Sequence, residues 1–221
     1  LVAVAASPRS AGKTYEEAVG GRCKMKTPMP EAAKKLVVLN VNQVEEVAAQ
    51  VDFVFSAVDM SKDEIRAIEE AYAKAEVPVV SNNSAHRWTP DVPMMVPELN
   101  PEHAEIIPYQ RKRLGTKRGF IAVKPNCSIQ SYTPALHALR EFEPTLVVAT
   151  TYQAISGAGK TFKDWPEMID NVIPYIAGEE EKSEQEPLRI WGKIEDGVIK
   201  KAEGPLITTQ CIRVPVEDGH T

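Results

Sequence analysis

The sequence predicts an α/β protein, with a parallel sheet that carries helices on its faces in the first half and an α+β second half. In the first half, strand-length runs of Val and Phe alternate with helical patterns of about 10–15 residues, as in βαβ units. The length of 221 residues suits one large domain or two smaller ones. The change of pattern favours two domains, which we place at 1–126 and 127–221.

The first half begins with "LVAVAASPRSAGKTYEEA", which predicts a short buried strand, a loop over 7–13 and the start of a helix. Apolar runs predict further strands at 36–40, 51–58 and 77–83. Helices are expected at 44–50 and 62–75, where apolar residues recur with helical spacing. Because the strands of such a sheet run parallel, ligands are expected at their carboxyl ends.

The composition changes over 83–108, where prolines at 90, 93, 97 and 101 exclude a helix and a central strand. We expect an ordered crossing loop there. After it, "KRGFIAVKPNCS" predicts a strand with a cysteine at its end. The remaining elements are expected as a helix over 129–142, a strand over 146–152, a turn at "SGAGK", helices at 165–171 and from 179, and a strand within 205–221.

Composition and charge disfavour several classes of function. The 26 basic and 31 acidic residues give a formal charge of −5 with no separate basic block, which argues against a nucleic-acid partner. The apolar runs fall far short of the roughly 20 residues needed to cross a bilayer, and no signal-peptide pattern is present, so no membrane partner is expected. Cys23, Cys127 and Cys211 lack metal-type spacing, so we expect no metal site and a reducing, cytoplasmic location.

Cys127 is the main candidate for a nucleophile, because it follows a strand at the point where a helix is expected to begin. The unpaired N–H groups and the positive dipole end of a first helical turn favour a thiolate. Asn126 beside it can donate to an oxyanion, and Ser128 can cap the helix. A buried structural cysteine explains this stretch equally well, because free Cys is among the most buried residue types.

Other stretches place polar side chains near expected strand ends. "TTYQAISGAGK" puts Gln153 before a turn of small residues, where backbone can approach a ligand closely. "CIRVPVEDGHT" carries Arg213, which suits a carboxylate, and His220, which suits proton transfer near pH 7. Arg87 in "SNNSAHR" is able to grip an anion. Each of these residues taken alone is more often structural or solvated.

The loop "SPRSAGK" combines Ser7 and Ser10 with Arg9 and Lys13 around a glycine. Such a set can surround a phosphate after a strand, although an ordinary basic turn has the same composition.

Six motifs, taken in order, resemble the aspartate-semialdehyde dehydrogenases of the fungal and archaeal branch: "SPRSAGK", "SNNSAHR", "PNCS", "QAISGAG", "NVIPYIAGEEEK" and "RVPVEDGHT". The resemblance covers nearly the whole chain. It implies a Rossmann-like NADP-binding domain followed by an α+β catalytic and dimerisation domain, both incomplete.

The resemblance also implies a reaction, in which L-aspartyl-4-phosphate and NADPH become aspartate 4-semialdehyde, NADP and phosphate in lysine, threonine and methionine biosynthesis. Cys127 would form a thioester, and His220 would act as general acid and base. Arg213 would hold the substrate α-carboxylate, and Gln153 would orient the acyl group. Asn126 matches a position that meets the leaving phosphate.

Further substrate contacts follow from the same resemblance. Arg87 also matches a position that meets the phosphate. Glu179 and Lys182 keep the E-x-x-K spacing by which the family binds the substrate amine and phosphate. Glu186 and Arg189 repeat this spacing, and the sequence leaves both pairs open.

The implied cofactor contacts come from three stretches. Ser7, Arg9 and Ser10 match the loop that meets the adenosine 2′-phosphate, which favours NADPH over NADH. The other residues implied to face the dinucleotide are Ser56, Ala57, Ser156 and Gly157.

The sequence departs from the family at both ends. No G-x-T-G-x-x-G turn precedes Leu1, and the chain stops one residue after His220, where the family continues. We expect a fragment of a longer gene product or a chain with segments missing, and a homodimer or homotetramer at full length. Two alternatives stay open: a related acyl reductase, such as malonyl-CoA reductase or N-acetyl-glutamyl-phosphate reductase, and a non-catalytic remnant that binds nucleotide or protein.

Overall fold

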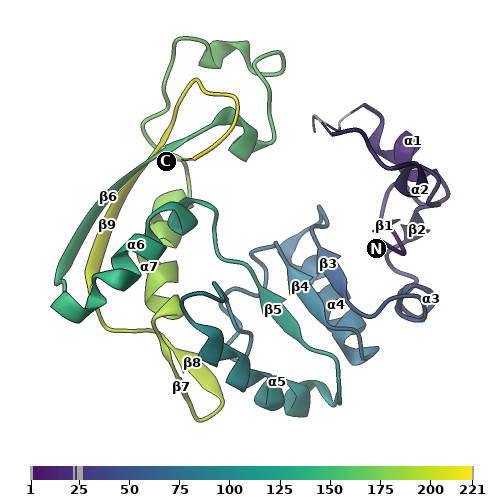
Figure 1. Cartoon of the computed structure of the whole chain (residues 1–221), viewed down its shortest axis with the longest axis horizontal. Helices are drawn as coiled ribbons and strands as arrows, with labels where there is room; N and C mark the ends of the chain where they lie inside the picture. Colours follow the sequence, from purple (N-terminus) through teal and green to yellow (C-terminus); the bar gives the residue numbers. More distant parts are fainter. Residues whose placement is uncertain (1, 22, 24–26, 221) are drawn as a thin grey trace. The chain divides into compact units, whose positions relative to one another are not determined.

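The computed structural model describes residues 2–21, 23 and 27–220, and the chain forms two compact units (Figure 1). The first unit contains Leu1–Pro93 and Ile106–Val123, and the second contains Met94–Glu105 and Lys124–Thr221. The domain boundary after residue 126 stays a prediction; the units differ from it mainly in residues 94–105, which belong to the second unit. Within the described ranges, no helix is both long and apolar enough to cross a membrane.

A βαβ arrangement forms the centre of the first unit. Strands β3 (Val54–Ser56), β4 (Val79–Ser81) and β5 (Ile121–Val123) form a parallel sheet in that order. Helix α4 (Lys62–Lys74) connects the first two strands and begins at a capping box in which the Ser61 hydroxyl accepts the N–H of Glu64. It buries Ile65, Ile68 and Tyr72, which recur with helical spacing. Parallel pairing and helix α4 are as expected.

Short elements precede this sheet in the first unit. Strand β1 (Ala6–Ser7) pairs in parallel with β2 (Leu39–Asn40) in a separate two-stranded sheet. The helices here are α1 (Tyr15–Val19), α2 (Glu31–Lys34) and α3 (Val44–Ala48). Ser7 therefore ends a strand, whereas the sequence placed it at the start of a loop.

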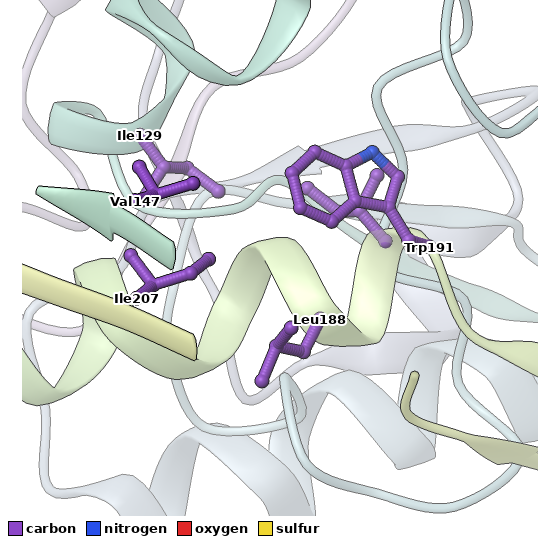
Figure 2. Close-up of a cluster of buried hydrophobic side chains, with 6 residues drawn as sticks. Ile129, Val147, Leu188, Trp191 and Ile207 are labelled. Atoms are coloured by element: carbon purple, nitrogen blue, oxygen red, sulfur yellow. The ribbon is translucent and has the colours of Figure 1, made fainter. Parts of the chain in front are cut away.

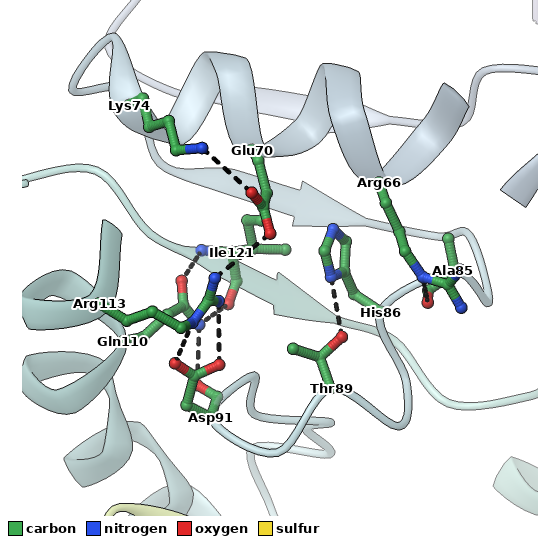
Figure 3. A network of polar contacts seen from close by, with 10 residues as sticks. All are labelled: Arg66, Glu70, Lys74, Ala85, His86, Thr89, Asp91, Gln110, Arg113 and Ile121. Atoms are coloured by element: carbon green, nitrogen blue, oxygen red, sulfur yellow. Dashed lines mark hydrogen bonds and ion pairs between the residues drawn. The ribbon is translucent and has the colours of Figure 1, made fainter. Parts of the chain in front are cut away.

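The proline-rich segment is ordered, but the expectation that it holds no helix was wrong at its end. The 3₁₀-helix η1 (Pro101–Ile106) begins at a proline. Proline is well tolerated there, because the N–H of the first helical residue has no partner within the helix. Helix α5 (Ile107–Leu114) follows directly. Its buried Gln110 donates to the carbonyls of Asp91 and Ile121 at 2.9 Å each, and Arg113 pairs with the Asp91 carboxylate (Figure 3).

A pair of long strands and one helix organise the second unit. Strands β6 (Leu146–Gln153) and β9 (Leu206–Arg213) pair in parallel along their whole length, and α7 (Glu179–Ile190) packs against β9 (Figure 1). A hairpin of β7 (Lys193–Glu195) and β8 (Val198–Lys200) follows α7. The buried side chains of the two strands alternate with exposed ones, which gives the sheet one core face.

The core of the second unit gathers around α7 and the sheet (Figure 2). Its buried members are Ile129, Val147, Leu188, Ile190, Trp191 and Ile207. Ile129 lies two residues after Cys127 and is fully buried. The core therefore anchors residues 124–128, which we call the cysteine loop.

The expected helix over 129–142 is broken into three pieces. They are η2 (Ser128–Ser131), α6 (Thr133–Ala138) and η3 (Arg140–Phe142). Pro134 lies in the first turn of α6, and because proline has no backbone N–H it cannot continue a helix from residue 128.

One further expectation in the second unit was wrong. The helix expected at 165–171 is a single turn, η5 (Pro166–Met168), since Asp170 adopts a left-handed φ of 57°. The turn at "SGAGK" contains the 3₁₀-helix η4 (Ile155–Ala158). Strand β9 ends at Arg213, two residues before Pro215, so His220 lies in the exit loop.

Candidate functional site

Cys127 is exposed at the N-terminal end of η2, between two buried residues. The side-chain oxygen of Asn126 accepts hydrogen bonds from the N–H of Ser128 at 2.8 Å and from its hydroxyl at 2.9 Å. Asn126 therefore caps this turn, and the expectation that Ser128 does so was wrong. Because η2 has four residues, the argument from the dipole of a long helix does not apply to Cys127.

The first turn of α7 carries a cation and an anion close to the cysteine loop. Lys182 Nζ lies 2.7 Å from Glu179 Oε1, and the side-chain amide of Asn126 donates to the same oxygen at 3.2 Å. Glu179 thus has two donors on one oxygen. The Asn126 amide, expected to meet a phosphate, is hydrogen-bonded to a carboxylate instead.

The two candidate E-x-x-K/R pairs differ in exposure. The side chains of Glu179 and Lys182 are 14% and 36% exposed, whereas Glu186 is fully buried and Arg189 is 4% exposed. Arg189 donates to the carbonyl of Ile199 at 3.2 Å. A ligand in solution can therefore reach the first pair more readily than the second.

The strand ends of β6 and β9 bring Gln153 and Arg213 side by side, since they are the last partners of the parallel register. Both side chains are buried. The loop after β9 folds back over the end of β6, where the backbone of His220 forms an isolated antiparallel β-bridge with that of Gln153. The N–H of Ala154 donates to the carbonyl of Gly219 at 3.0 Å, which holds this loop in place.

Gly157 allows the closest approach in this cluster. A Cβ built on Gly157 would lie 2.6 Å from Cε1 of His220 and 2.8 Å from Nη1 of Arg213. A Cβ at this position would therefore displace the ends of the His220 and Arg213 side chains from the places they occupy here. The imidazole also borders an open cavity of about 570 Å³, which is lined further by Ser131, Tyr132, Leu136 and residues 147–151.

Burial lowers the pKa of the Arg213 guanidinium, and the nearby Glu179, Cys127 and Cys211 oppose this effect. Arg213 stays a cation at neutral pH because arginine titrates far above it. Its Nη1 donates to the carbonyl of Ala154 at 2.7 Å, which orients the guanidinium. An oriented, partly desolvated cation suits the binding of an anionic substrate group.

Tyr132 joins α7 to the wall of the same cavity. Its hydroxyl donates to the carbonyl of Ser183 at 2.6 Å. Burial raises the pKa of this hydroxyl, so it remains a donor throughout the physiological range.

In the first unit, the Ser7 hydroxyl accepts the N–H groups of Arg9 at 3.2 Å and Ser10 at 3.3 Å. The Arg9 side chain is 71% exposed and lies 2.7 Å from Asp59. A turn with an exposed guanidinium and two serine hydroxyls fits a phosphate monoester such as the one that distinguishes NADP from NAD. Asp59 competes for the same cation.

The other cofactor candidates in the first unit are placed differently from one another. The Ser56 hydroxyl donates to the buried carboxylate of Glu69 at 2.6 Å, whereas Ala57 after it is exposed. In the second unit, the N–H of the cofactor candidate Ser156 donates to the carbonyl of Glu217 at 3.1 Å.

Arg87 of the first unit was expected to meet the substrate phosphate. It is 6% exposed and donates to the carbonyl of Asn82 at 3.5 Å, so the solvated alternative for it does not hold.

The sequence did not reveal several residues that support these sites. The carboxylate of Glu69 accepts hydrogen bonds from the side chains of Ser56, Ser81 and Asn83. No sequence motif indicated this role. Ser183 and Glu186 lie four and seven residues after Glu179, the spacing of one helical face, and that spacing was the available signal.

Two family models cover most of the chain. Residues 1–107 match the semialdehyde dehydrogenase NAD binding domain, and residues 135–221 match the semialdehyde dehydrogenase dimerisation domain. Among curated proteins, aspartate-semialdehyde dehydrogenase from Methanothermobacter thermautotrophicus is 39% identical over 222 residues, which is 100% of this chain and 61% of that protein. The enzyme of the same name from Aspergillus fumigatus is 39% identical over 224 residues, with 100% and 60% covered.

Solved structures agree with these matches. Aspartate-semialdehyde dehydrogenase with NADP from Candida albicans superposes with a TM-score of 0.81 at 34% identity and covers 100% of this chain and 62% of that one. The type II enzyme from Vibrio cholerae gives a TM-score of 0.65 at 26% identity, with 97% and 62% covered. The chain thus spans about three-fifths of the length of the proteins that it matches. It combines a Rossmann-type α/β unit with an α+β unit, and it belongs to the semialdehyde dehydrogenase family, in which its fungal and archaeal relatives are aspartate-semialdehyde dehydrogenases.

Proposed function

We propose that the protein to which this chain belongs reduces L-aspartyl-4-phosphate to aspartate 4-semialdehyde with release of phosphate. The observation that carries the proposal is the grouping of Gln153, Arg213 and His220 at one end of the β6 and β9 pair. A geometric link to Cys127 supports the proposal, because the side chain of the preceding Asn126 donates to Glu179 in the first turn of α7 at 3.2 Å.

Cys127 is proposed to supply the nucleophile. Its sulfur attacks the acyl carbon of the substrate, the bond from that carbon to the phosphate oxygen breaks, and a thioester remains on the enzyme. NADP, in its reduced form, supplies the hydride that the thioester then needs. The carbon–sulfur bond of the resulting thiohemiacetal breaks, which releases the aldehyde and regenerates the thiolate.

His220 is proposed to move the protons of this sequence. Its Nδ1 side faces the backbone of Ala154 and Gly219, and its Nε2 edge lies against Gly157 at the site. Histidine is suited to this role because its ordinary pKa is close to neutral. It would give a proton to the oxygen of the thiohemiacetal as hydride adds to the thioester, and take that proton back as the carbon–sulfur bond breaks.

Substrate recognition is proposed to use opposite charges. Arg213 binds the α-carboxylate through its fork of N–H donors, and Gln153 orients the acyl oxygen. Glu179 binds the α-ammonium group, and Lys182 and Asn126 meet the phosphate. Arg87 is proposed, separately, as a residue that binds a phosphate group. The exposure of the first turn of α7 supports Glu179 and Lys182 over the buried pair that follows.

The dinucleotide is proposed to be NADP rather than NAD. Ser7, Arg9 and Ser10 would hold its 2′-phosphate, and the exposed Arg9 guanidinium supports this assignment. Further contacts would come from Ser56, Ala57, Ser156 and Gly157. The match to a dimerisation domain supports assembly into a homodimer or homotetramer.

The proposal is tested by following NADP reduction with aspartate semialdehyde as substrate, with and without phosphate. Activity that depends on phosphate and disappears in a Cys127→Ala variant is expected. Malonyl-CoA is the comparison, because a related acyl reductase would use the same cysteine and histidine. Preference for malonyl-CoA would reject the aspartyl substrate, and the absence of substrate-protected labelling at Cys127 would favour a non-catalytic binding protein.

A further inference from the structure

The cysteine loop is attached to one face of α7 on both sides of Cys127. Before the cysteine, the backbone N–H of Asn126 donates to Oε2 of Glu186 at 2.6 Å. After it, the Ser128 hydroxyl lies 2.9 Å from the hydroxyl of Ser183. Residues 183 and 186 are three apart and therefore lie on one side of the helix. The cysteine is exposed between two attachment points.

The carboxylate of Glu186 is fully buried in the described part of the chain. Burying a carboxylate is costly unless its oxygens receive hydrogen bonds. A hydrogen bond of 2.6 Å from a backbone N–H to a fixed acceptor oxygen restricts the peptide plane of the donor. The peptide plane of Asn126 directly precedes Cys127, so fixing it restricts the direction in which the thiol can point.

We propose that Glu186 is a positioning residue for Cys127, acting through the backbone N–H of Asn126 without contacting the substrate. This role depends on the length of the side chain. An acceptor oxygen must lie at hydrogen-bond distance from the N–H of Asn126, as Oε2 does at 2.6 Å, whereas a negative charge is not required. Glu186 and Arg189 are then not the pair that binds substrate. The kinetic part of the inference rests on the proposed function, but the reactivity of the thiol does not.

Two substitutions of Glu186 distinguish the effect of side-chain length from that of the negative charge. Glu186→Gln keeps a side-chain oxygen at the same distance and removes the charge, whereas Glu186→Asp keeps the charge and shortens the side chain by one methylene. Matched controls are Glu181→Gln and Glu181→Asp, because Glu181 is exposed on the same helix. Melting temperatures of all variants are measured so that kinetic changes are read from folded protein.

The first readout is the alkylation of Cys127 by iodoacetamide, followed in the peptide that contains it, since Cys23 is also exposed. Glu186→Asp is expected to change this rate by at least about threefold, because the hydrogen bond to Asn126 is lost or lengthened. Glu186→Gln and both Glu181 variants are expected to stay within about twofold of the unchanged protein. Equal rates in folded Glu186→Asp and unchanged protein would overturn the proposal.

The second readout is steady-state kinetics with aspartate semialdehyde. Glu186→Asp is expected to lower kcat by about tenfold with KM unchanged, and Glu186→Gln to keep both constants, since misplacing a nucleophile affects the chemical step. A higher KM in Glu186→Gln would instead assign the charge of Glu186 to substrate binding and overturn the proposal. If the unchanged protein does not turn over aspartate semialdehyde, the proposed function fails while the alkylation result still decides the role of Glu186.

Discussion

The imidazole of His220 lies against the backbone of Gly157, so closely that a Cβ on the glycine would stand 2.6 Å from Cε1 of the ring. The same Cβ would stand 2.8 Å from Nη1 of Arg213. The positions of these two side chains therefore depend on the absence of a side chain at residue 157. In Gly157→Ala, the ends of the histidine and arginine side chains must shift away from the new Cβ.

We expect Gly157→Ala to lower kcat/KM for aspartate semialdehyde by about 100-fold, because a shift of about 1 Å in catalytic groups has an effect of this size. The melting temperature should change little, since Gly157 lies in an exposed turn. Ala158→Ser is the control, because it enlarges the next residue of the same exposed turn. Equal kinetic losses in both variants would show that the turn, not the contact with His220, is responsible.

Glu76 gives a prediction about acid stability. Its carboxylate accepts the backbone N–H groups of Lys117, Arg118 and Gly119, which lowers the pKa of Glu76 from 4.5 to about 2. Because the folded-state pKa is depressed, the contribution of Glu76 to stability is complete above pH 4.5 and is lost as the pH falls towards 2.

Glu76→Gln should therefore lower the melting temperature at pH 7, and its difference from the unchanged protein should shrink between pH 4.5 and pH 2. Thermal unfolding followed by circular dichroism at several pH values measures this difference. The exposed Glu203→Gln serves as control, with no comparable change expected. A difference that stayed constant with pH would contradict the role assigned to the Glu76 carboxylate.

The ion pair of Arg9 and Asp59 leads to a prediction about cofactor choice. Hydrogen bonds to charged groups contribute about 1.5–3 kcal/mol, so Arg9→Ala is expected to raise the KM for NADP by about 10- to 100-fold. The KM for NAD should change little, because NAD lacks the 2′-phosphate. Asp59→Asn, which removes the competing partner, should lower the KM for NADP. Equal effects of Arg9→Ala on both dinucleotides would contradict the assignment of Arg9.

The buried Ile129 connects the cysteine loop to the core of the second unit (Figure 2). Ile129→Ala is expected to reduce the free energy of unfolding by about 2–5 kcal/mol, because it leaves a cavity among Val147, Trp191 and their neighbours. Urea denaturation measures this loss. Leu139→Ala is the control, since Leu139 is 50% exposed, and a loss there as large as at Ile129 would contradict the core assignment.

The pairing of Gln153 with Arg213 was accessible from the sequence, because both residues end apolar strands and such ends meet at one edge of a parallel sheet. The contact of His220 with Gly157 was not accessible. It depends on hydrogen bonds between the backbone of 154–156 and the carbonyls of 216–219, which have no sequence signature.

Other differences came from signals that were present but not used. Pro134 marks the break in the helix expected over 129–142. Asp196-Gly197 between two short segments that contain Ile194 and Val198-Ile199 is a typical hairpin signal, and it joins β7 to β8. The burial of Glu186 could not be predicted from spacing, because exposed and buried pairs share the same E-x-x-K/R spacing.

The proposed mechanism requires Cys127 to carry the acyl group of an aspartyl substrate. Its most direct test is to mix the protein with aspartate semialdehyde and NADP in the absence of phosphate, and to measure the mass of the peptide that contains Cys127 together with the NADPH formed. We expect an aspartyl thioester on Cys127, about one equivalent of NADPH, and the release of the adduct when phosphate is added. NADPH formation without an adduct on Cys127, or with an adduct that phosphate does not release, would contradict it.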